Sequence, residues 1–193
     1  MSSERPLPIR VAQTLGITSS LMLSGLTIST SLTTIPRLLE SPPSLLLQQW
    51  GNMYKRGAKI GPPVSLLAST SFFYLAYKAH VSPSLFDGIS NGTNIAASSS
   101  SSLPNKVVAY ILAGVLSIGI VPYTFAVLMP TNKELLRKVE VLGKVELSGE
   151  EEAEMKEAER SAHQLVDWWG VLNLGRGVML AVSGVVGVWT SLG

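Results

Sequence analysis

The sequence predicts an all-α integral membrane protein, a bundle of four hydrophobic helices that form one domain over residues 1–193. Only 15% of the residues are charged, against about 25% in ordinary soluble domains. The mean hydropathy is positive, at +0.33. Four segments lack charge, or nearly so, over the roughly 20 residues that a helix needs to cross a bilayer. We place these spans at approximately 11–35, 60–79, 107–130 and 167–191.

Small residues and prolines indicate how the spans are built. The first span is rich in Ser, Thr and Gly, so we expect it to pack closely against other helices. Pro62 and Pro63 open the second span and suit a first helical turn better than a helix interior. Pro122 falls inside the third span, where we expect a kink.

The connections between the spans differ in composition. Residues 41–59 place Trp50 and Tyr54 one helical turn apart beside basic residues, which is typical of a short interfacial segment, and a role in substrate binding is the alternative. Residues 80–105 are polar and low in complexity, which predicts a loop.

Between the third and fourth spans the chain is highly charged, and we expect a helical hairpin there. Thr131 or Asn132 can cap its first helix. Ser148, with Glu151 three places on, can cap a second helix that leads into the fourth span.

The distribution of basic residues predicts the orientation. Lysines and arginines concentrate in residues 36–59 and 131–166, so the positive-inside rule places both loops in the cytoplasm and both termini in the lumen. The sequon Asn91-Gly92-Thr93 lies in the loop predicted to be lumenal, which indicates a glycoprotein. We expect the endoplasmic reticulum or a related endomembrane as the host.

Composition excludes several classes of function. The chain has no cysteine, so disulfides and thiolate chemistry are excluded. With two histidines, a three-histidine metal site within one chain is impossible. The net charge of +2 and the scattered basic residues do not indicate nucleic-acid binding. No phosphate loop, dinucleotide fingerprint, GxSxG or HExxH motif occurs.

Arg176 is the strongest candidate for a functional residue. It lies roughly 13 Å along the fourth span from Asp167, inside the hydrocarbon, where an arginine costs about 2.5–3.5 kcal/mol. Asn173 and Trp169 fall near the same helix face. The three suit a pocket for a planar apolar ligand with phenol or carbonyl oxygens. The alternatives are a structural arginine on a kinked helix, and packing beside an interfacial tryptophan.

Two further groups of residues can carry chemistry. His163 and Asp167 are spaced i, i+4, so the carboxylate can orient the imidazole, although a solvated pair at a helix end fits equally well. A metal site that adds Glu159 to this pair lacks a second imidazole. Tyr123 and Thr124 follow Pro122 and offer hydroxyls for a second wall of the pocket.

At these positions the chain resembles the fungal anthrone oxygenases, small four-span membrane proteins encoded beside aromatic polyketide synthases. The resemblance covers most of the chain. The order of its motifs and their placement relative to the four spans are more specific than any single motif. Its marks are Ser24-Gly25, Pro36, Trp50, Tyr54, Gly57, Pro122, Thr124, Met129–Asn132, Trp169, Asn173 and Arg176.

The resemblance implies oxidation of an anthrone, a hydrophobic polycyclic aromatic substrate, to an anthraquinone within the lipid bilayer. Molecular oxygen would be the co-substrate, and neither flavin nor haem would be required; no metal-ligating residues are assigned, and metal dependence is left open. Arg176 and Asn173 would stabilise the oxyanion, and His163 with Asp167 or, in competition, Tyr123 would be the base. Substrate-binding roles would fall to Trp169, Trp50, Tyr54, Thr124 and Asn132.

The alternative from another class is a non-enzymatic four-span scaffold or a small-molecule transporter. Arg176 would then serve structure or the passage of an anion. The sequence leaves open whether several chains assemble into a homo-oligomer.

Overall fold

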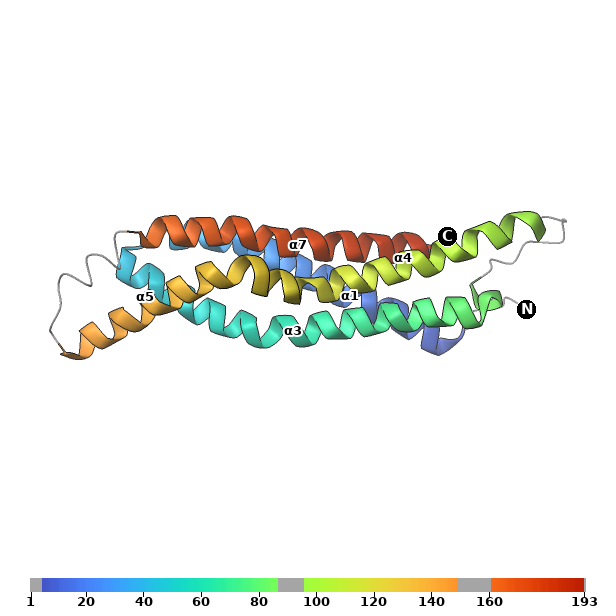
Figure 1. Ribbon diagram of the computed structural model, residues 1–193, viewed down its shortest axis with the longest axis horizontal. Helices are drawn as coiled ribbons and strands as arrows, with labels where there is room; N and C mark the ends of the chain where they lie inside the picture. Colours follow the sequence, from blue (N-terminus) through green and yellow to red (C-terminus); the bar gives the residue numbers. More distant parts are fainter. Residues whose placement is uncertain (1–4, 87–95, 149–160, 193) are drawn as a thin grey trace. The chain divides into compact units, whose positions relative to one another are not determined.

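A computed structural model describes residues 5–86, 96–148 and 161–192, and within these ranges all regular structure is helical, which confirms the all-α class (Figure 1). The described elements are α1 (Leu7–Ser29), the π-helical turn η1 (Thr30–Thr34), α2 (Ile35–Leu38), α3 (Pro43–Val81), the 3₁₀ turn η2 (Pro83–Leu85), α4 (Ala96–Tyr123), the π-helical turn η3 (Thr124–Leu128), α5 (Met129–Ser148) and α7 (Ala162–Leu192).

Three helical segments are long and apolar enough to cross a membrane, namely Leu7–Leu38, Asn105–Val141 and Ala162–Leu192. They contain three of the four predicted spans, so the chain is a multi-pass membrane protein. The remaining predicted span, 60–79, lies inside α3, where prolines, serines and tyrosines dilute the apolar residues. That this segment also crosses the bilayer stays a prediction.

The prediction that Pro62 and Pro63 open a helix is wrong. Both lie in the interior of α3, which begins at Pro43 and also absorbs the segment 43–59 that we expected to be a separate interfacial piece. Interior prolines cost about 3 kcal/mol each in helix propensity, because each removes a backbone donor. Buried residues anchor α3 on both sides of the pair, including Trp50 before it and Phe72 after it, and this packing outweighs the local penalty.

Two expectations for the second half of the chain also need correction. Residues 96–105 are helical and belong to α4, although we predicted a loop. Thr131 and Asn132 lie inside α5 and cap nothing, because the chain continues from α4 through η3 into α5. Ser148 is the last residue of α5. The helix expected to follow it and the sequon at Asn91 lie outside the described residues.

The chain divides into two compact units, and each of α1, α3, α4 and α7 contributes to both. Unit 1 comprises Met1–Ser24, Pro63–Ile120 and Met179–Gly193. Its core gathers buried apolar side chains around Phe72, Leu75 and Tyr110. Unit 2 comprises Gly25–Pro62 and Val121–Val178.

Serine hydroxyls link the helices of unit 1. The hydroxyls of Ser117 on α4 and Ser183 on α7 lie 2.8 Å apart, and Ser183 also donates to the carbonyl of Ala113 at 2.7 Å. Ser65 on α3 donates to the carbonyl of Ser117, and Ser20 on α1 donates to the carbonyl of Leu180. Such bonds hold helices together in lipid, where water does not compete for them.

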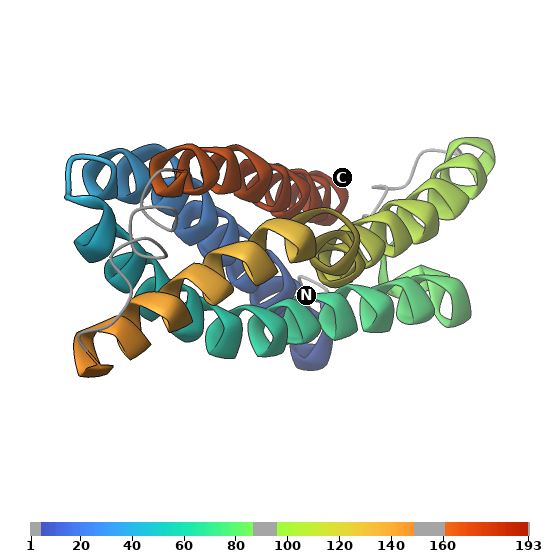
Figure 2. The same cartoon turned by 60° about the vertical axis from the view of Figure 1, so that its left-hand side comes forward.

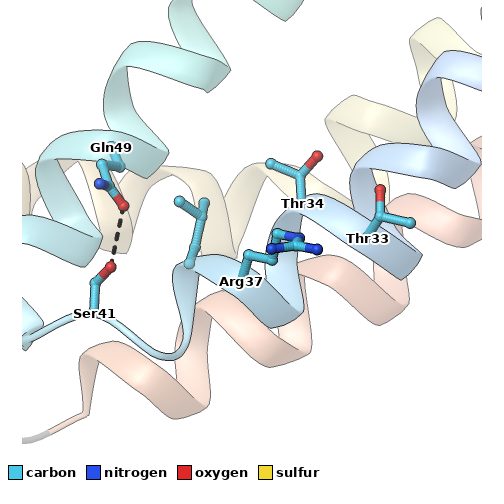
Figure 3. A pocket seen from close by; sticks show the side chains of 6 residues that line it. Thr33, Thr34, Arg37, Ser41 and Gln49 are labelled. Carbon is cyan, nitrogen blue, oxygen red and sulfur yellow. Dashed lines mark hydrogen bonds between the residues drawn. The ribbon is translucent and has the colours of Figure 1, made fainter.

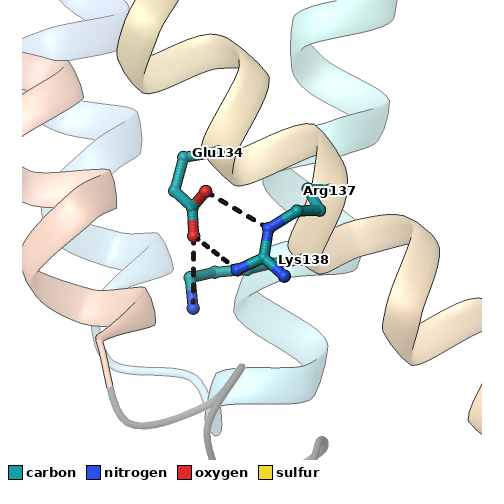
Figure 4. A network of polar contacts seen from close by, with 3 residues as sticks. All are labelled: Glu134, Arg137 and Lys138. Carbon is teal, nitrogen blue, oxygen red and sulfur yellow. Dashed lines mark hydrogen bonds and ion pairs between the residues drawn. The ribbon is translucent and has the colours of Figure 1, made fainter.

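Unit 2 has its own core, built around Trp50, Leu128 and Trp169. Within it α5 lies beside the first half of α3, as both ribbon views show (Figure 1 and Figure 2). The side chain of Val139 on α5 packs against Gly51 on α3. In α5 the Glu134 carboxylate lies 2.9 Å from Arg137 and 3.8 Å from Lys138 (Figure 4). The side chain of Lys138 is only 5% exposed, so this carboxylate compensates a largely buried ammonium group.

Candidate functional site

All ten residues that the sequence singles out lie in unit 2. Three of them, Trp169, Asn173 and Arg176, follow one another along one face of α7, as their spacing predicts. Trp169 is 4% exposed and Asn173 2% exposed, and Arg176 is partly buried. The fourth predicted span therefore turns its polar residues towards protein.

Asn173 links α7 to α1 and to the π-helical turn η1. Its Nδ2 donates to the carbonyl oxygen of Thr27 at 3.2 Å and to the hydroxyl oxygen of Ser31 at 3.0 Å. Its Oδ1 accepts a longer bond, 3.4 Å, from Nη1 of Arg176. Sequence reasoning missed Thr27 and Ser31, because one serine or threonine in a span rich in both carries no distinguishing signal.

Aromatic rings from α3 and α7 form one cluster. The rings of Trp50 and Tyr54 stack, with centroids 5.1 Å apart and planes 14° apart. The ring of Trp169 meets Trp50 edge-on, with centroids 5.8 Å apart. Nε1 of Trp169 donates to Oδ1 of Asn132 at 2.7 Å, which joins α5 to this cluster. Stacked and edge-on aromatic surfaces are the kind of wall that holds a flat ring system.

Tyr123 belongs to the same neighbourhood as Arg176. Its hydroxyl donates to the carbonyl oxygen of Leu172 at 3.0 Å. A Cβ placed on Gly175 would overlap the Tyr123 hydroxyl, so the absence of a side chain at Gly175 is what admits the phenol. Gly175, against which the Tyr123 hydroxyl packs, is the residue directly before Arg176. Thr124, the next residue, opens η3 and is partly buried.

Three buried side-chain atoms among the described residues have no hydrogen-bond partner: Nε1 of Trp50, Nδ2 of Asn132 and Nε of Arg176. All three are N–H donors, and all three residues are among those that the sequence singles out. Buried polar groups normally have partners, because an unpaired one costs about 1–3 kcal/mol. A site with spare donors is complementary to a ligand with oxygen acceptors.

His163 and Asp167 do not form the predicted pair. A ring nitrogen of His163, Nε2, lies 3.1 Å from the carbonyl oxygen of Ser41, and the Asp167 side chain is exposed. Within the described part of the chain no ion pair joins them. His163 also precedes Arg176 by thirteen residues of continuous helix, about 20 Å along the axis. The two ends of the predicted catalytic set are therefore too far apart to act on one small substrate.

An open pocket of about 340 Å³ lies where α2 turns towards α3 (Figure 3). Thr33, Thr34 and Arg37 line one side, and Ser41 and Gln49, joined by a 3.3 Å hydrogen bond, line the other. No sequence motif predicts this pocket, because its lining residues are brought together only by the turn between α2 and α3. Among the described residues no group of three or more His, Asp or Glu side chains could hold a metal ion.

The described residues define an all-α membrane protein with a buried cluster of aromatic and polar side chains, three of which have N–H groups without a hydrogen-bond partner. A family model described as anthrone oxygenase matches residues 50–186, and the chain belongs to that family. It is an enzyme of the oxygenase type.

Curated relatives match over most of the chain. An anthrone oxygenase of Aspergillus fumigatus is 27% identical over 187 residues, covering 91% of this chain and 90% of the relative. An anthrone oxygenase of Paecilomyces divaricatus is 26% identical, covering 91% and 92%. A noranthrone monooxygenase of Aspergillus flavus is 25% identical, covering 86% and 66%. No solved structure matches the chain.

Proposed function

We propose that this enzyme oxidises an anthrone to the corresponding anthraquinone with molecular oxygen, as a step of aromatic polyketide biosynthesis in an endomembrane. The names of the relatives support the substrate class. The observation that carries the proposal is the set of three orphaned donors at Trp50, Asn132 and Arg176, because all three require acceptors. An anthrone offers a ketone and, when hydroxylated, phenolic oxygens, on a flat three-ring body.

The spacing of these donors suits a tricyclic substrate. Asn132 is tied to Trp169, and Trp169 precedes Arg176 by seven residues, about 10 Å along α7. That separation is comparable with the long axis of three linearly fused rings. A substrate lying along α7 could therefore meet the donors at both ends while its faces contact the aromatic cluster.

The chemistry follows from the substrate. Removal of a proton from the methylene carbon of an anthrone gives a carbanion whose charge is delocalised onto the ketone oxygen, as in an aromatic phenolate. This anion transfers an electron to O₂, and the radical pair combines into a hydroperoxide. Loss of water then gives the quinone, so one anthrone and one O₂ become one anthraquinone and one H₂O. The substrate supplies the electrons, and the proposal needs neither flavin nor haem.

The protein has two tasks in this sequence, to stabilise the oxyanion and to accept the proton. Arg176, with Asn173 beside it, is the cationic donor for the oxyanion. Tyr123 is the proton acceptor that we favour, with Tyr54 as its competitor. Either would act as the phenolate, so the Tyr123 hydroxyl that donates to the carbonyl oxygen of Leu172 must first lose its proton. His163 is too distant from Arg176 to share the same substrate.

Quinone formation by the purified protein in lipid nanodiscs, supplied with anthrone and oxygen in the presence of a chelator, tests the proposal. We expect turnover above the slow spontaneous oxidation, with one O₂ consumed per quinone. We expect Tyr123→Phe to lower kcat by about 10²-fold or more, the usual contribution of a general base. The matched variant His163→Gln should retain kcat within about threefold.

Two outcomes would count against the proposal. Absence of turnover by folded wild-type protein would favour a non-enzymatic scaffold or a transporter. Loss of kcat in His163→Gln with Tyr123→Phe unaffected would transfer the base to His163 and remove Arg176 from the oxyanion role.

A further inference from the structure

A stretch of α3 is uncovered beside the site. At about 100° per residue, Trp50, Tyr54, Gly57 and Gly61 fall within roughly 60° of one another around the helix axis. Trp50 and Gly61 are buried, as expected for this inward stripe. Gly57 lies between them on the same stripe and is nevertheless exposed. All of residues 55–60 are exposed as well, so α3 is uncovered on every side over this stretch, and Lys55, Arg56 and Lys59 surround Gly57.

The gap has defined neighbours at both ends. Six residues before Gly57, on another side of α3, Val139 of α5 covers Gly51, and a Cβ on Gly51 would lie 3.3 Å from that side chain. One turn after it, a Cβ on Gly61 would lie 3.3 Å from Nη2 of Arg176. A Cβ on Gly57 would meet nothing within 4 Å. The packing on α3 is thus interrupted for about one turn, next to Tyr54 on one side and the Arg176 guanidinium on the other.

We propose that this window over Gly57 is the outer part of the substrate site, through which a flat, oxygen-bearing aromatic molecule enters at the membrane surface, beside the start of the predicted span 60–79, and lodges against Tyr54 and Arg176. The inference rests on the proposed function for the identity of the substrate. The orphaned Nε of Arg176 gives the inner end an unpaired donor, and the Tyr54 ring, stacked on Trp50, gives it an aromatic wall. Gly57 is then a residue that determines access by having no side chain.

Filling the window is the direct test, and the chain supplies a matched control. Gly57→Leu places a branched side chain in the gap. Gly25→Leu makes the same change on α1, at another exposed helical glycine of unit 2 whose Cβ would also meet nothing within 4 Å. Leucine is a better helix former than glycine, so neither variant should unfold the protein through local propensity.

Two readouts separate this inference from the proposed function. The first is equilibrium binding of unsubstituted anthraquinone to nanodisc-embedded protein, followed by quenching of tryptophan emission, which needs no turnover. The second is kcat/KM for anthrone oxidation. We expect Gly57→Leu to weaken quinone binding and to lower kcat/KM by about tenfold or more, mostly through KM, while Gly25→Leu stays within about twofold of wild type.

Each outcome decides one of the two claims. Quinone binding that Gly57→Leu alone weakens supports the window even if anthrone is not oxidised, in which case only the proposed function fails. Wild-type turnover with unchanged binding and KM in Gly57→Leu overturns the window and leaves the proposed function standing. Equal losses in Gly57→Leu and Gly25→Leu also overturn the window, because the effect would then not depend on position.

Discussion

At the scale of single residues, Arg176 is the one that the sequence identifies best. A charge inside an apolar span needs a reason, and the structure gives it a partner in Asn173. The orphaned donors of Trp50 and Asn132 are different, because a missing partner is a property of packing and leaves no mark in the sequence. The sequence therefore predicts which residues matter and not which of their atoms are free.

Arg176→Met is expected to separate stability from activity. The methionine keeps much of the apolar stem and removes a cation that costs about 2.5–3.5 kcal/mol at the centre of a bilayer. We therefore expect the thermal midpoint in nanodiscs to stay level or rise, while kcat falls by about 10²-fold or more through loss of oxyanion stabilisation.

Arg56→Met serves as the control, because Arg56 is an exposed arginine on α3 in the same unit. It should leave both quantities near wild type. A variant Arg176→Met that no longer folds in membranes would show that this arginine is structural.

At the scale of elements, the length of each apolar segment predicts that a helix exists but does not predict where the helix begins and ends. The interior position of Pro62 and Pro63 could not be predicted from propensity, because packing on both sides of the pair holds α3 together. Likewise Asn132 has the residue type of a cap, and the chain instead continues through the π-helical turn η3 into α5. Both π-helical turns, η1 and η3, lie in unit 2 beside candidate site residues, where such turns commonly occur in proteins.

Ser183→Ala tests how the helices of unit 1 are joined. The hydroxyl of Ser183 contacts both Ser117 and the carbonyl of Ala113 on α4. Its removal should lower the free energy of unfolding by about 0.6–1.7 kcal/mol, the range found for hydrogen bonds between membrane helices. Steric trapping or thermal unfolding in nanodiscs would measure this.

Thr70→Ala is the matched control, because the hydroxyl of Thr70 bonds only to backbone oxygens of its own helix, at Leu66 and Leu67. It should change stability by less than Ser183→Ala does. Equal effects would mean that the link between α4 and α7 does not depend on this hydroxyl.

At the scale of the whole molecule, composition alone predicts an all-α membrane protein, and the structure and the family agree. Orientation in the membrane is a separate matter, since it rests on the placement of lysines and arginines and leaves no trace in a fold. Whether residues 60–79 cross the bilayer cannot be read from the helix either, because α3 is helical on both sides of that segment.

Single cysteines can decide both questions, because the chain has none of its own. Ser44→Cys and Ser84→Cys place exposed thiols just inside the start of α3 and just after its end. In sealed microsomes, a membrane-impermeant maleimide added outside should label Cys at position 44 and spare Cys at position 84. Labelling of both would show that residues 60–79 do not cross.

The three unpaired N–H groups have a consequence for the end of the proposed reaction. Oxidation converts the methylene of the substrate, which accepts no hydrogen bond, into a second carbonyl, which does. Donors that the substrate leaves partly unpaired therefore gain an acceptor in the product, and the quinone should be held more tightly than the anthrone. Progress curves should slow well before the anthrone is exhausted, and added quinone should reproduce that slowing. Dissolution of the quinone in surrounding lipid would then govern the steady rate of the enzyme.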